Sequence, residues 1–202
     1  MLIAISNGSL VLIVTLVVAA IVVATIVLRR RREHIWSGIA RQLGLQFTLE
    51  EGQPCVSGLL DDRRFILSTI PDSSDTGPLG VEVVRVSLKL RHTVPGGLTL
   101  ESADDLLGDA QRLIDEHQLQ TGDGRFDHSV TAHATDVESA LDWLTTERRS
   151  AIRKLIRDRV SGDVKLVDNE LQWTCRESVS NESALTRQIT LMRQTASILD
   201  VE

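Results

Sequence analysis

This 202-residue chain has no tyrosine, three phenylalanines, three tryptophans and two cysteines. With so few aromatic rings, the core must consist mainly of Leu, Val, Ile and Ala, and stacking surfaces for bases or sugars are scarce. Two cysteines cannot build a disulfide framework, and no Cys-x-x-Cys spacing is present. Cys55 and Cys175 each lie in an apolar stretch typical of a strand, so we expect buried free thiols. The alternative, one Cys55–Cys175 bond, would require an oxidising compartment.

The common sequence signatures of catalysis are also missing. The chain has no glycine-rich phosphate loop of the GxGxxG or GxxxxGK(S/T) type, no GxSxG nucleophile turn and no HExxH motif. Nucleotide, hydrolase and zinc-protease chemistry is therefore not supported by any motif. We expect no cofactor and no metal.

Basic residues are outnumbered by acidic ones, and four of the basic residues form one short cluster. The chain has 22 Lys and Arg against 28 Asp and Glu, and four of the basic residues are consecutive, Arg29–Arg32. Without these and Glu33, residues 34–202 keep 18 basic and 27 acidic side chains, a net charge of −9. An acidic domain repels the phosphates of nucleic acids, so we exclude nucleic acid as a partner.

One long hydrophobic run is present, from Leu10 to Leu28, and it contains no charge. As a helix it would extend about 28 Å, near the thickness of a hydrocarbon core. Residues 1–9 have no Lys or Arg and no cleavage site precedes the arginines, which argues against a cleaved signal peptide. A buried helix is the other alternative, but a helix apolar on all sides needs a large core. We therefore predict a single transmembrane helix over residues 10–28 in contact with the lipid bilayer.

The charges beside this run predict its orientation. Cytoplasmic flanks are enriched in Lys and Arg, and Arg29–Arg32 follow the run directly. We expect a single-pass protein of the inner (cell) membrane with residues 1–9 outside and 10–28 in the bilayer. Residues 29–34 would form a basic juxtamembrane segment with Arg29, Arg30, Arg31 and Arg32 as membrane-flanking residues. Residues 35–202 would form one cytoplasmic domain, which is a usual size.

The periodicity of the remainder predicts helices and short strands in alternation. The expected elements begin with a helix at 34–43, which continues or follows the anchor and is ended by Gly44. After it we expect strands at 45–49, 55–60, 64–70 and 81–91, with a loop at 71–80. The rest would be a helix at 103–117 capped by Ser102; a turn at 121–125; a strand at 127–134; helices from 137 that bend at Thr145; a hairpin of 164–167 with 171–175; and a helix at 182–200. Consecutive strands with short turns, such as Asp61-Asp62 and Asp168-Asn169, favour antiparallel pairing. The predicted fold class is α+β: the transmembrane helix, then a mixed or antiparallel sheet with helices on one face.

The best candidate for chemistry is the turn at residues 122–128. Asp123, Asp127 and His128 could hold a cation or serve as acid and base. The structural interpretation, which we favour, is a turn whose glycines permit positive φ and whose Phe126 anchors the core. His128 and His133 would face opposite sides of a regular strand, which makes them a poor pair of metal ligands.

Basic residues also recur between Glu147 and Lys154. We interpret Glu147-Arg148-Arg149 and Arg153-Lys154 as a solvated helix face rather than as a binding patch.

A longer sequence pattern, which begins in the turn at residues 122–128, resembles one found in a group of bacterial proteins. It runs from Gly122-Asp123 through Phe126-Asp127, a strand and Asp136 to the segment 144–155 with its Glu147-Arg148-Arg149 run. Together with the Trp36-x-x-Ile39-Ala40 start and the Gly58 hairpin, it is similar to uncharacterised bacterial proteins that have a GDxxFD turn and a membrane anchor. The resemblance implies no established activity and gives no functional residues to carry over.

From these features we predict a cytoplasmic binding or scaffold module with a protein partner. The alternative is a membrane-tethered enzyme that uses Asp123, Asp127 and His128, with or without a divalent cation.

Overall fold

The computed structural model describes residues 7–71, 82–103, 119–176 and 181–201, with side chains of α1 described from Thr15 onward. The expected loop at 71–80 and helix at 103–117 lie almost wholly outside these ranges, as does most of the expected N-terminal flank.

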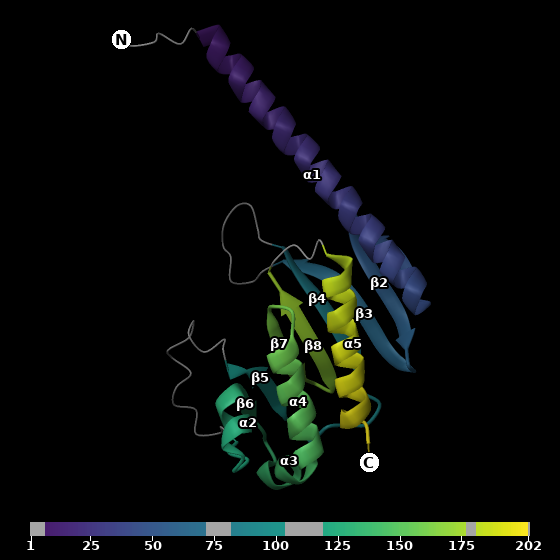
Figure 1. The fold of residues 1–202 in the computed structure, drawn as a ribbon, viewed down its shortest axis with the longest axis vertical. Helices are drawn as coiled ribbons and strands as arrows, with labels where there is room; N and C mark the ends of the chain where they lie inside the picture. Colours follow the sequence, from purple (N-terminus) through teal and green to yellow (C-terminus); the bar gives the residue numbers. More distant parts are fainter. Residues whose placement is uncertain (1–6, 72–81, 104–118, 177–180, 202) are drawn as a thin grey trace, which may run out of the picture.

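The described residues form one sheet accompanied by helices (Figure 1). The elements in chain order are α1 (Asn7–Leu43), β1 (Gln46–Glu50), β2 (Gln53–Leu60), β3 (Arg63–Pro71), β4 (Glu82–Lys89), β5 (Thr99–Ser102), α2 (Gly124–Ser129), β6 (Val130–His133), α3 (Val137–Trp143), α4 (Thr146–Asp158), β7 (Asp163–Val167), β8 (Glu170–Cys175) and α5 (Glu182–Leu199). The sheet has eight strands in the order β1-β2-β3-β4-β8-β7-β5-β6. Its described pairings are all antiparallel, and the predicted α+β class is confirmed.

Two predicted hairpins are confirmed, and local backbone chemistry explains both. Asp61 and Asp62, between β2 and β3, have φ of 52° and 57°, and Asp168 and Asn169, between β7 and β8, have φ of 50° and 67°. Two-residue turns that match the twist of a hairpin need positive φ at both positions. Asp and Asn tolerate that conformation better than most residues, so they specify the turns.

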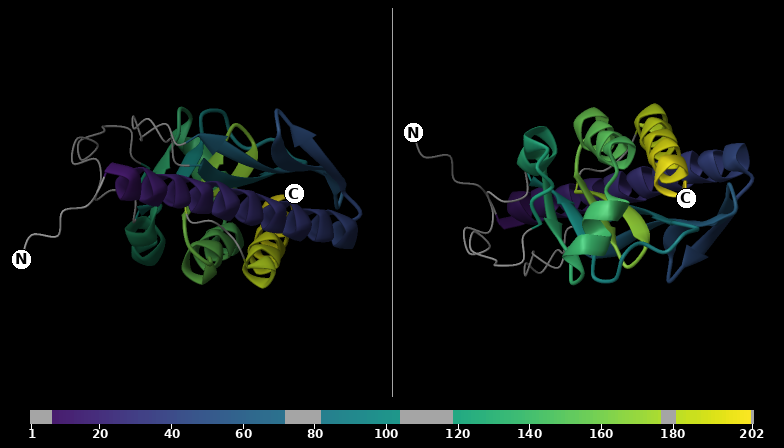
Figure 2. Two further views of the ribbon diagram at one scale, coloured as in Figure 1. Left: turned by 90° about the horizontal axis from the view of Figure 1, so that it is seen from above. Right: turned by 90° about the horizontal axis from the view of Figure 1, so that it is seen from below.

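The core lies between the sheet and the helices. Figure 2 shows α2, α4 and α5 on the same side of the sheet. On β4, alternate side chains face this layer, and Val84, Val86 and Leu88 are buried as the two-residue period of a strand requires. The C-terminal end of α1 contacts β1, β2 and α5, where Trp36 and Ile39 are fully enclosed.

The N-terminal helix corrects the sequence prediction. α1 is continuous from Asn7 to Leu43, so the helix expected at 34–43 continues the N-terminal helix without a break. Within the described part of the chain, no helix is long and apolar enough to span a membrane. The described apolar stretch of α1 runs from Thr15 to Leu28, where Arg29–Arg32 follow. The predicted transmembrane helix is therefore wrong.

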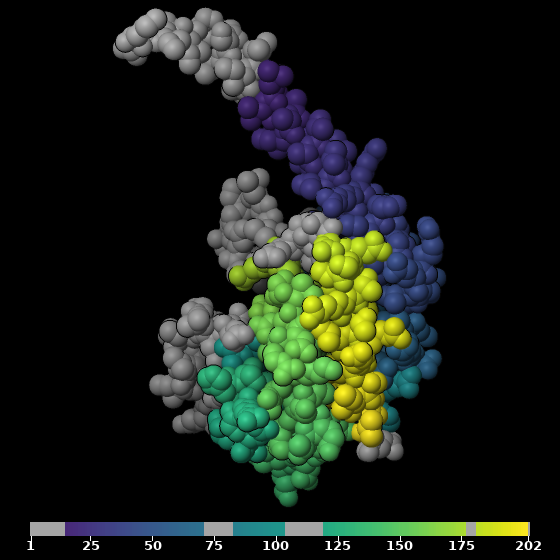
Figure 3. Space-filling model, viewed as in Figure 1, coloured from purple at the N-terminus to yellow at the C-terminus, as the bar shows by residue number. Residues whose placement is uncertain are grey.

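The described apolar side chains of this stretch are nevertheless exposed. Leu16, Ile21 and Val23 each expose about three-fifths of their surface. Figure 3 shows this part of α1 standing clear of the rest of the protein. The cytoplasmic position of residues 35–202, which was argued from the span, stays a prediction.

Both cysteines are free and buried, as predicted. Cys55 lies on β2 and Cys175 on β8, and β3 and β4 lie between these strands. Three strand spacings amount to about 14 Å, whereas disulfide formation needs Cα atoms within about 7 Å. The alternative of a Cys55–Cys175 bond is excluded by the sheet order.

The prediction was less accurate between residues 99 and 133. The strand β5 was not expected, and Ser102, expected as a helix cap, is its last residue. Residues Gly124–Ser129 form the short helix α2 in place of the expected turn and early strand, and β6 begins only at Val130. Asp123 starts this helix because its Oδ1 accepts hydrogen bonds from the backbone of Arg125 and Phe126, at 3.0 and 3.2 Å.

Candidate functional site

The candidate site lies between α2 and α4, and the amphipathic pattern of α4 creates it. Thr145 caps α4 by accepting a hydrogen bond from the Arg148 N–H, as the predicted bend at Thr145 requires. Ile152, Leu155 and Ile156 are buried. The basic residues between these apolar positions are consequently held on the outer side of the helix.

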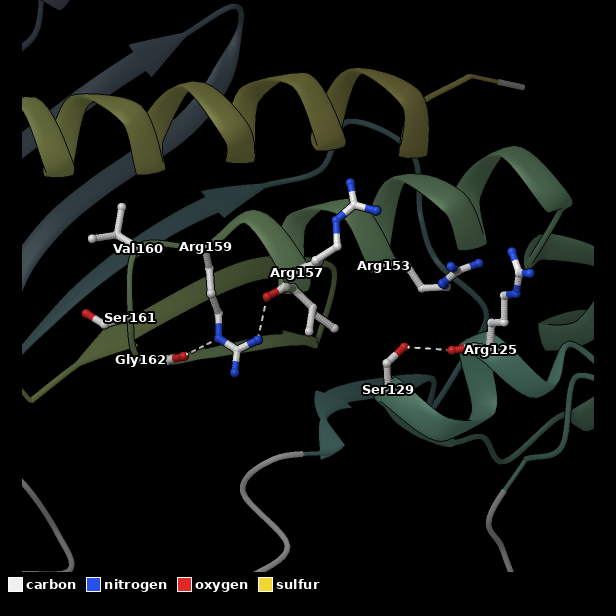
Figure 4. Close-up of a pocket in the computed structure, with 9 residues that line it drawn as sticks. Arg125, Ser129, Arg153, Arg157, Arg159, Val160, Ser161 and Gly162 are labelled. Atoms are coloured by element: carbon white, nitrogen blue, oxygen red, sulfur yellow. Dashed lines mark hydrogen bonds between the residues drawn. The ribbon is translucent and has the colours of Figure 1, made fainter.

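A cavity of about 580 Å³ opens here. Its volume is within the range of small-molecule sites. Three segments line it: α2, α4 and the connection from α4 to β7 (Figure 4). The lining residues are Arg125, Ser129, Arg153, Ile156, Arg157, Arg159, Val160, Ser161 and Gly162. Four of the nine are arginines, which makes the cavity cationic.

Two of these arginines are held by the protein itself. Arg159 donates to the Gly162 carbonyl oxygen through Nε at 2.7 Å, and its Nη1 donates to the Ile156 carbonyl oxygen at the end of α4. Arg157 donates from Nε to Asp158 at 2.8 Å. Their guanidinium groups are therefore partly committed to the fold.

The other two arginines are Arg125 on α2 and Arg153 on α4, and their guanidinium N–H groups are available to a ligand. Within the described ranges, neither side chain donates a hydrogen bond or forms an ion pair. Figure 4 shows both at the same end of the cavity. Each guanidinium has five N–H donors in a fixed plane, a geometry suited to carboxylate and phosphate oxygens.

The carboxylate of Asp123 is near this end. Its pKa lies below the ordinary value, first because the Phe126 N–H donates to it, and also because Arg153 and Arg149 are nearby. Arg149 Nε is 3.9 Å from its Oδ2. One carboxylate thus faces several guanidinium groups, and positive charge remains in excess.

The local charge is opposite to that of the chain. Between Thr145 and Gly162 there are six basic and two acidic residues, while the whole chain has a net charge of −6. The basic residues of this segment are therefore concentrated rather than scattered.

The connection from α4 to β7 forms a fixed wall. The Gln188 side chain, completely buried in α5, accepts a hydrogen bond from the Val160 N–H at 3.2 Å. Trp173 Nε1 donates to the Ser161 carbonyl oxygen at 2.5 Å. Gly162 has φ of +82°, and a Cβ there would overlap the Thr174 carbonyl. This side of the cavity is thus preorganised.

None of the sequence-predicted candidates Asp123, Asp127 and His128 lines the cavity. Asp123 and Asp127 hold the start of α2 and the turn before it through hydrogen bonds. Asp127 accepts from the Thr121 N–H at 3.1 Å, the Thr121 hydroxyl at 2.7 Å and the Gly122 N–H at 3.2 Å. His128 is exposed on α2. Among the described residues, no group of three or more His, Cys, Asp or Glu is arranged to hold a metal ion.

The predicted flanking arginines, Arg29–Arg32, are on α1 and do not line the cavity. Arg29 pairs with Glu33 at 3.2 Å and donates to the Gly52 carbonyl oxygen at 2.5 Å. It therefore joins α1 to the turn between β1 and β2.

A second cavity of about 720 Å³ lies between the end of α1 and α5. Its polar groups are largely engaged with one another. Gln42 donates to Glu182 at 3.1 Å, and Asn181 caps α5 through the Ser183 N–H at 3.0 Å. It offers no concentration of one charge, so the arginine-lined cavity is the stronger candidate.

Most of the site was not predicted from the sequence. Arg153 was noticed but interpreted as part of a solvated face, and Arg125 and Arg159 were not considered. The available signal was the spacing of Arg149, Arg153 and Arg157, which are four residues apart and therefore share one face of a helix.

Comparison with known proteins gives one fold likeness. No family model matches the chain, and no curated protein matches it. A solved structure, described as the crystal structure of the mycobacterial trehalose monomycolate transport factor A, TtfA, is similar with a TM-score of 0.53 and 12% sequence identity. The match covers 85% of this chain and 94% of that one. At this identity the likeness shows the fold alone: the arrangement of sheet and helices is one that also occurs in TtfA.

Proposed function

We propose that this chain is a binding module whose arginine-lined cavity takes an anionic ligand. The observation that carries the proposal is the pair Arg125 and Arg153, two guanidinium groups from separate helices that line one cavity and make no described side-chain hydrogen bond or ion pair. Two guanidinium groups that lie close together repel each other, and an anion bound between them offsets that repulsion.

The chemistry of the lining favours binding over catalysis. Charge-assisted hydrogen bonds from arginine are about twice as strong as neutral ones. The two serines of the lining are engaged elsewhere: Ser129 donates to the Arg125 carbonyl oxygen at 3.0 Å, and Ser161 is 3.2 Å from Cys175 Sγ. The lining contains no acid, histidine or cysteine that could act as a general base or nucleophile.

The fold likeness supports a role of this binding module in transport. The similar structure is, by its description, a transport factor. We therefore propose that this chain serves a transport process as a binding or scaffold protein, which agrees with the interpretation made from its sequence.

The test is calorimetric titration of the full chain with inorganic phosphate at low ionic strength. We expect binding to the unmodified protein and at least tenfold weaker binding after the double substitution Arg125→Ala and Arg153→Ala. The matched control is Lys154→Ala, which removes one exposed positive charge of α4 outside the cavity. Binding that weakens equally in the control and in the double variant would contradict the proposal.

The alternative, an enzyme based on Asp123, Asp127 and His128, has a separate test. The substitution Asp127→Asn removes a carboxylate that accepts three hydrogen bonds. We expect lower thermal stability that does not depend on added Mg²⁺, Mn²⁺ or Zn²⁺. A metal-dependent rise in the melting temperature of the unmodified chain, lost in this variant, would favour the enzyme.

A further inference from the structure

We infer that the ligand of the arginine-lined cavity is a phosphate monoester with an aliphatic tail. This inference rests on the proposed function and specifies its ligand. One end of the cavity holds Arg125 and Arg153, and the other offers aliphatic surface beside an arginine that backbone carbonyl oxygens already hold. The two ends therefore call for different parts of one molecule.

The charged end fits a phosphate. Arg125 and Arg153 approach the cavity from α2 and α4, and Figure 4 shows them together at one end. A carboxylate has two oxygens and is satisfied by one guanidinium. A terminal phosphate has three oxygens and nearly two negative charges at neutral pH, so it can bridge two guanidinium groups.

The cavity is too large for a phosphate alone. Its volume of about 580 Å³ leaves room for an organic substituent. At the end away from Arg125, Val160 exposes 40% of its surface beside Arg159, whose guanidinium group is held by backbone carbonyl oxygens. Ile156 contributes a second aliphatic side chain to the lining. An alkyl chain bound here would remove exposed apolar surface of Val160 from water.

The lining disfavours a nucleotide. Base recognition commonly uses an aromatic ring as a stacking surface. The nine lining residues include no aromatic ring, and both of their large apolar members are aliphatic. An aliphatic alcohol is therefore a better match than a nucleoside for the group esterified to the phosphate.

The experiment compares inorganic phosphate, hexyl phosphate, hexanoate and adenosine monophosphate in titrations of the full chain. We expect hexyl phosphate to bind about tenfold more tightly than inorganic phosphate, the gain from burying about two methylene groups. Hexanoate and adenosine monophosphate should both bind more weakly than hexyl phosphate. The substitution Val160→Ser should remove the gain in affinity that the hexyl chain gives over inorganic phosphate. The control Val137→Ser alters a similarly exposed valine of α3 outside the cavity. It should change neither the affinity for inorganic phosphate nor the gain from the hexyl chain.

The outcomes separate this inference from the proposed function. If inorganic phosphate binds through the arginines but the hexyl chain adds no affinity, the inference fails and the anion-binding function stands. If adenosine monophosphate or hexanoate binds as tightly as hexyl phosphate, the inference also fails. If no anion binds, both fail.

A further experiment distinguishes a lipid headgroup from a free phosphate ester as the ligand. The protein is sedimented with phosphatidylcholine vesicles that contain phosphatidic acid. If the unmodified chain sediments with them and the Arg125→Ala, Arg153→Ala variant does not, the ligand is a lipid headgroup. Binding of hexyl phosphate without such sedimentation would identify a free ester.

Discussion

Among individual residues, the pair of Arg63 and Asp200 carries the largest expected effect on stability. Their side chains are each only 5% exposed, and Arg63 Nε is 2.6 Å from Asp200 Oδ2. The other carboxylate oxygen accepts from the backbone N–H groups of Arg91 and His92, at 2.8 and 3.1 Å. The pair therefore joins the start of β3, the end of β4 and the end of α5.

Removing one partner of this pair leaves a buried charge without compensation. We predict that Asp200→Asn lowers the free energy of unfolding by about 3 kcal/mol. Asp62→Asn, which breaks an ion pair to Arg91 at a side chain that is 87% exposed, should cost less than about 1 kcal/mol. Urea unfolding at neutral pH measures both. Similar small losses in the two variants would show that the buried pair is not a stabilising contact.

Asp61 should give the protein an acid-sensitive contact. Arg193 donates two hydrogen bonds to its carboxylate, both at 2.8 Å, and these hold the pKa of Asp61 below its ordinary value. Because the pKa is lower in the folded state, the stabilisation is complete above the unfolded pKa of about 3.9 and is lost as the pH falls through the folded value.

The variant Asp61→Asn isolates this contribution, since Asn also tolerates the φ of 52° found there. We predict that the variant is less stable than the unmodified chain at pH 7, by up to about 1 kcal/mol. Unfolding curves recorded from pH 7 to pH 2 should show this difference shrinking below about pH 4. A difference that stays constant over the whole range would contradict the assignment.

Among the elements, the connection from α4 to β7 has the strictest backbone requirement. Gly162 has a φ of +82°, and its Cα faces the Thr174 carbonyl so closely that no side chain fits. We predict that Gly162→Ala lowers the free energy of unfolding by more than about 1 kcal/mol. Gly124→Ala, at the start of α2 with open space around it, should be neutral or slightly stabilising. Thermal unfolding compares the two, and equal effects would show that the Thr174 contact does not matter.

Elements specified by local chemistry were predicted well. The Asp61-Asp62 and Asp168-Asn169 turns and the cap at Thr145 depend on residues adjacent in sequence, and all three were recognised. β5 was missed because it has only four residues and is specified by distant partners. One of its contacts, Lys165 to Glu101 at 3.2 Å, joins residues 64 positions apart. The cavity was missed for the same reason, since it forms only when α2 packs against α4.

For the whole molecule, the important feature is the separation of charge. The chain has a net charge of −6, yet the segment from Thr145 to Gly162 has an excess of basic residues. The acidic remainder repels anions, while the cavity attracts them at short range. We therefore predict that inorganic phosphate binds severalfold more weakly in 0.5 M than in 0.05 M NaCl, because salt screens the arginines. Affinity that is independent of salt would argue against an electrostatic site.

The hydrophobic run was the main source of error in the sequence prediction. Its composition suggested a span over residues 10–28, whereas no helix in the described ranges is long and apolar enough to cross a membrane. Hydropathy does not report where a helix ends, and here Trp36 and Ile39 extend it into the folded domain.

The most direct test of the anion site is crystallographic. Crystals of the full chain grown with tungstate, an oxyanion shaped like phosphate that scatters anomalously, would locate the bound anion without any assumption about the ligand. We predict an anomalous peak between the guanidinium groups of Arg125 and Arg153, and its loss in the variant that replaces both with Ala. Occupied tungstate sites elsewhere on the protein, with none in this cavity, would contradict the account.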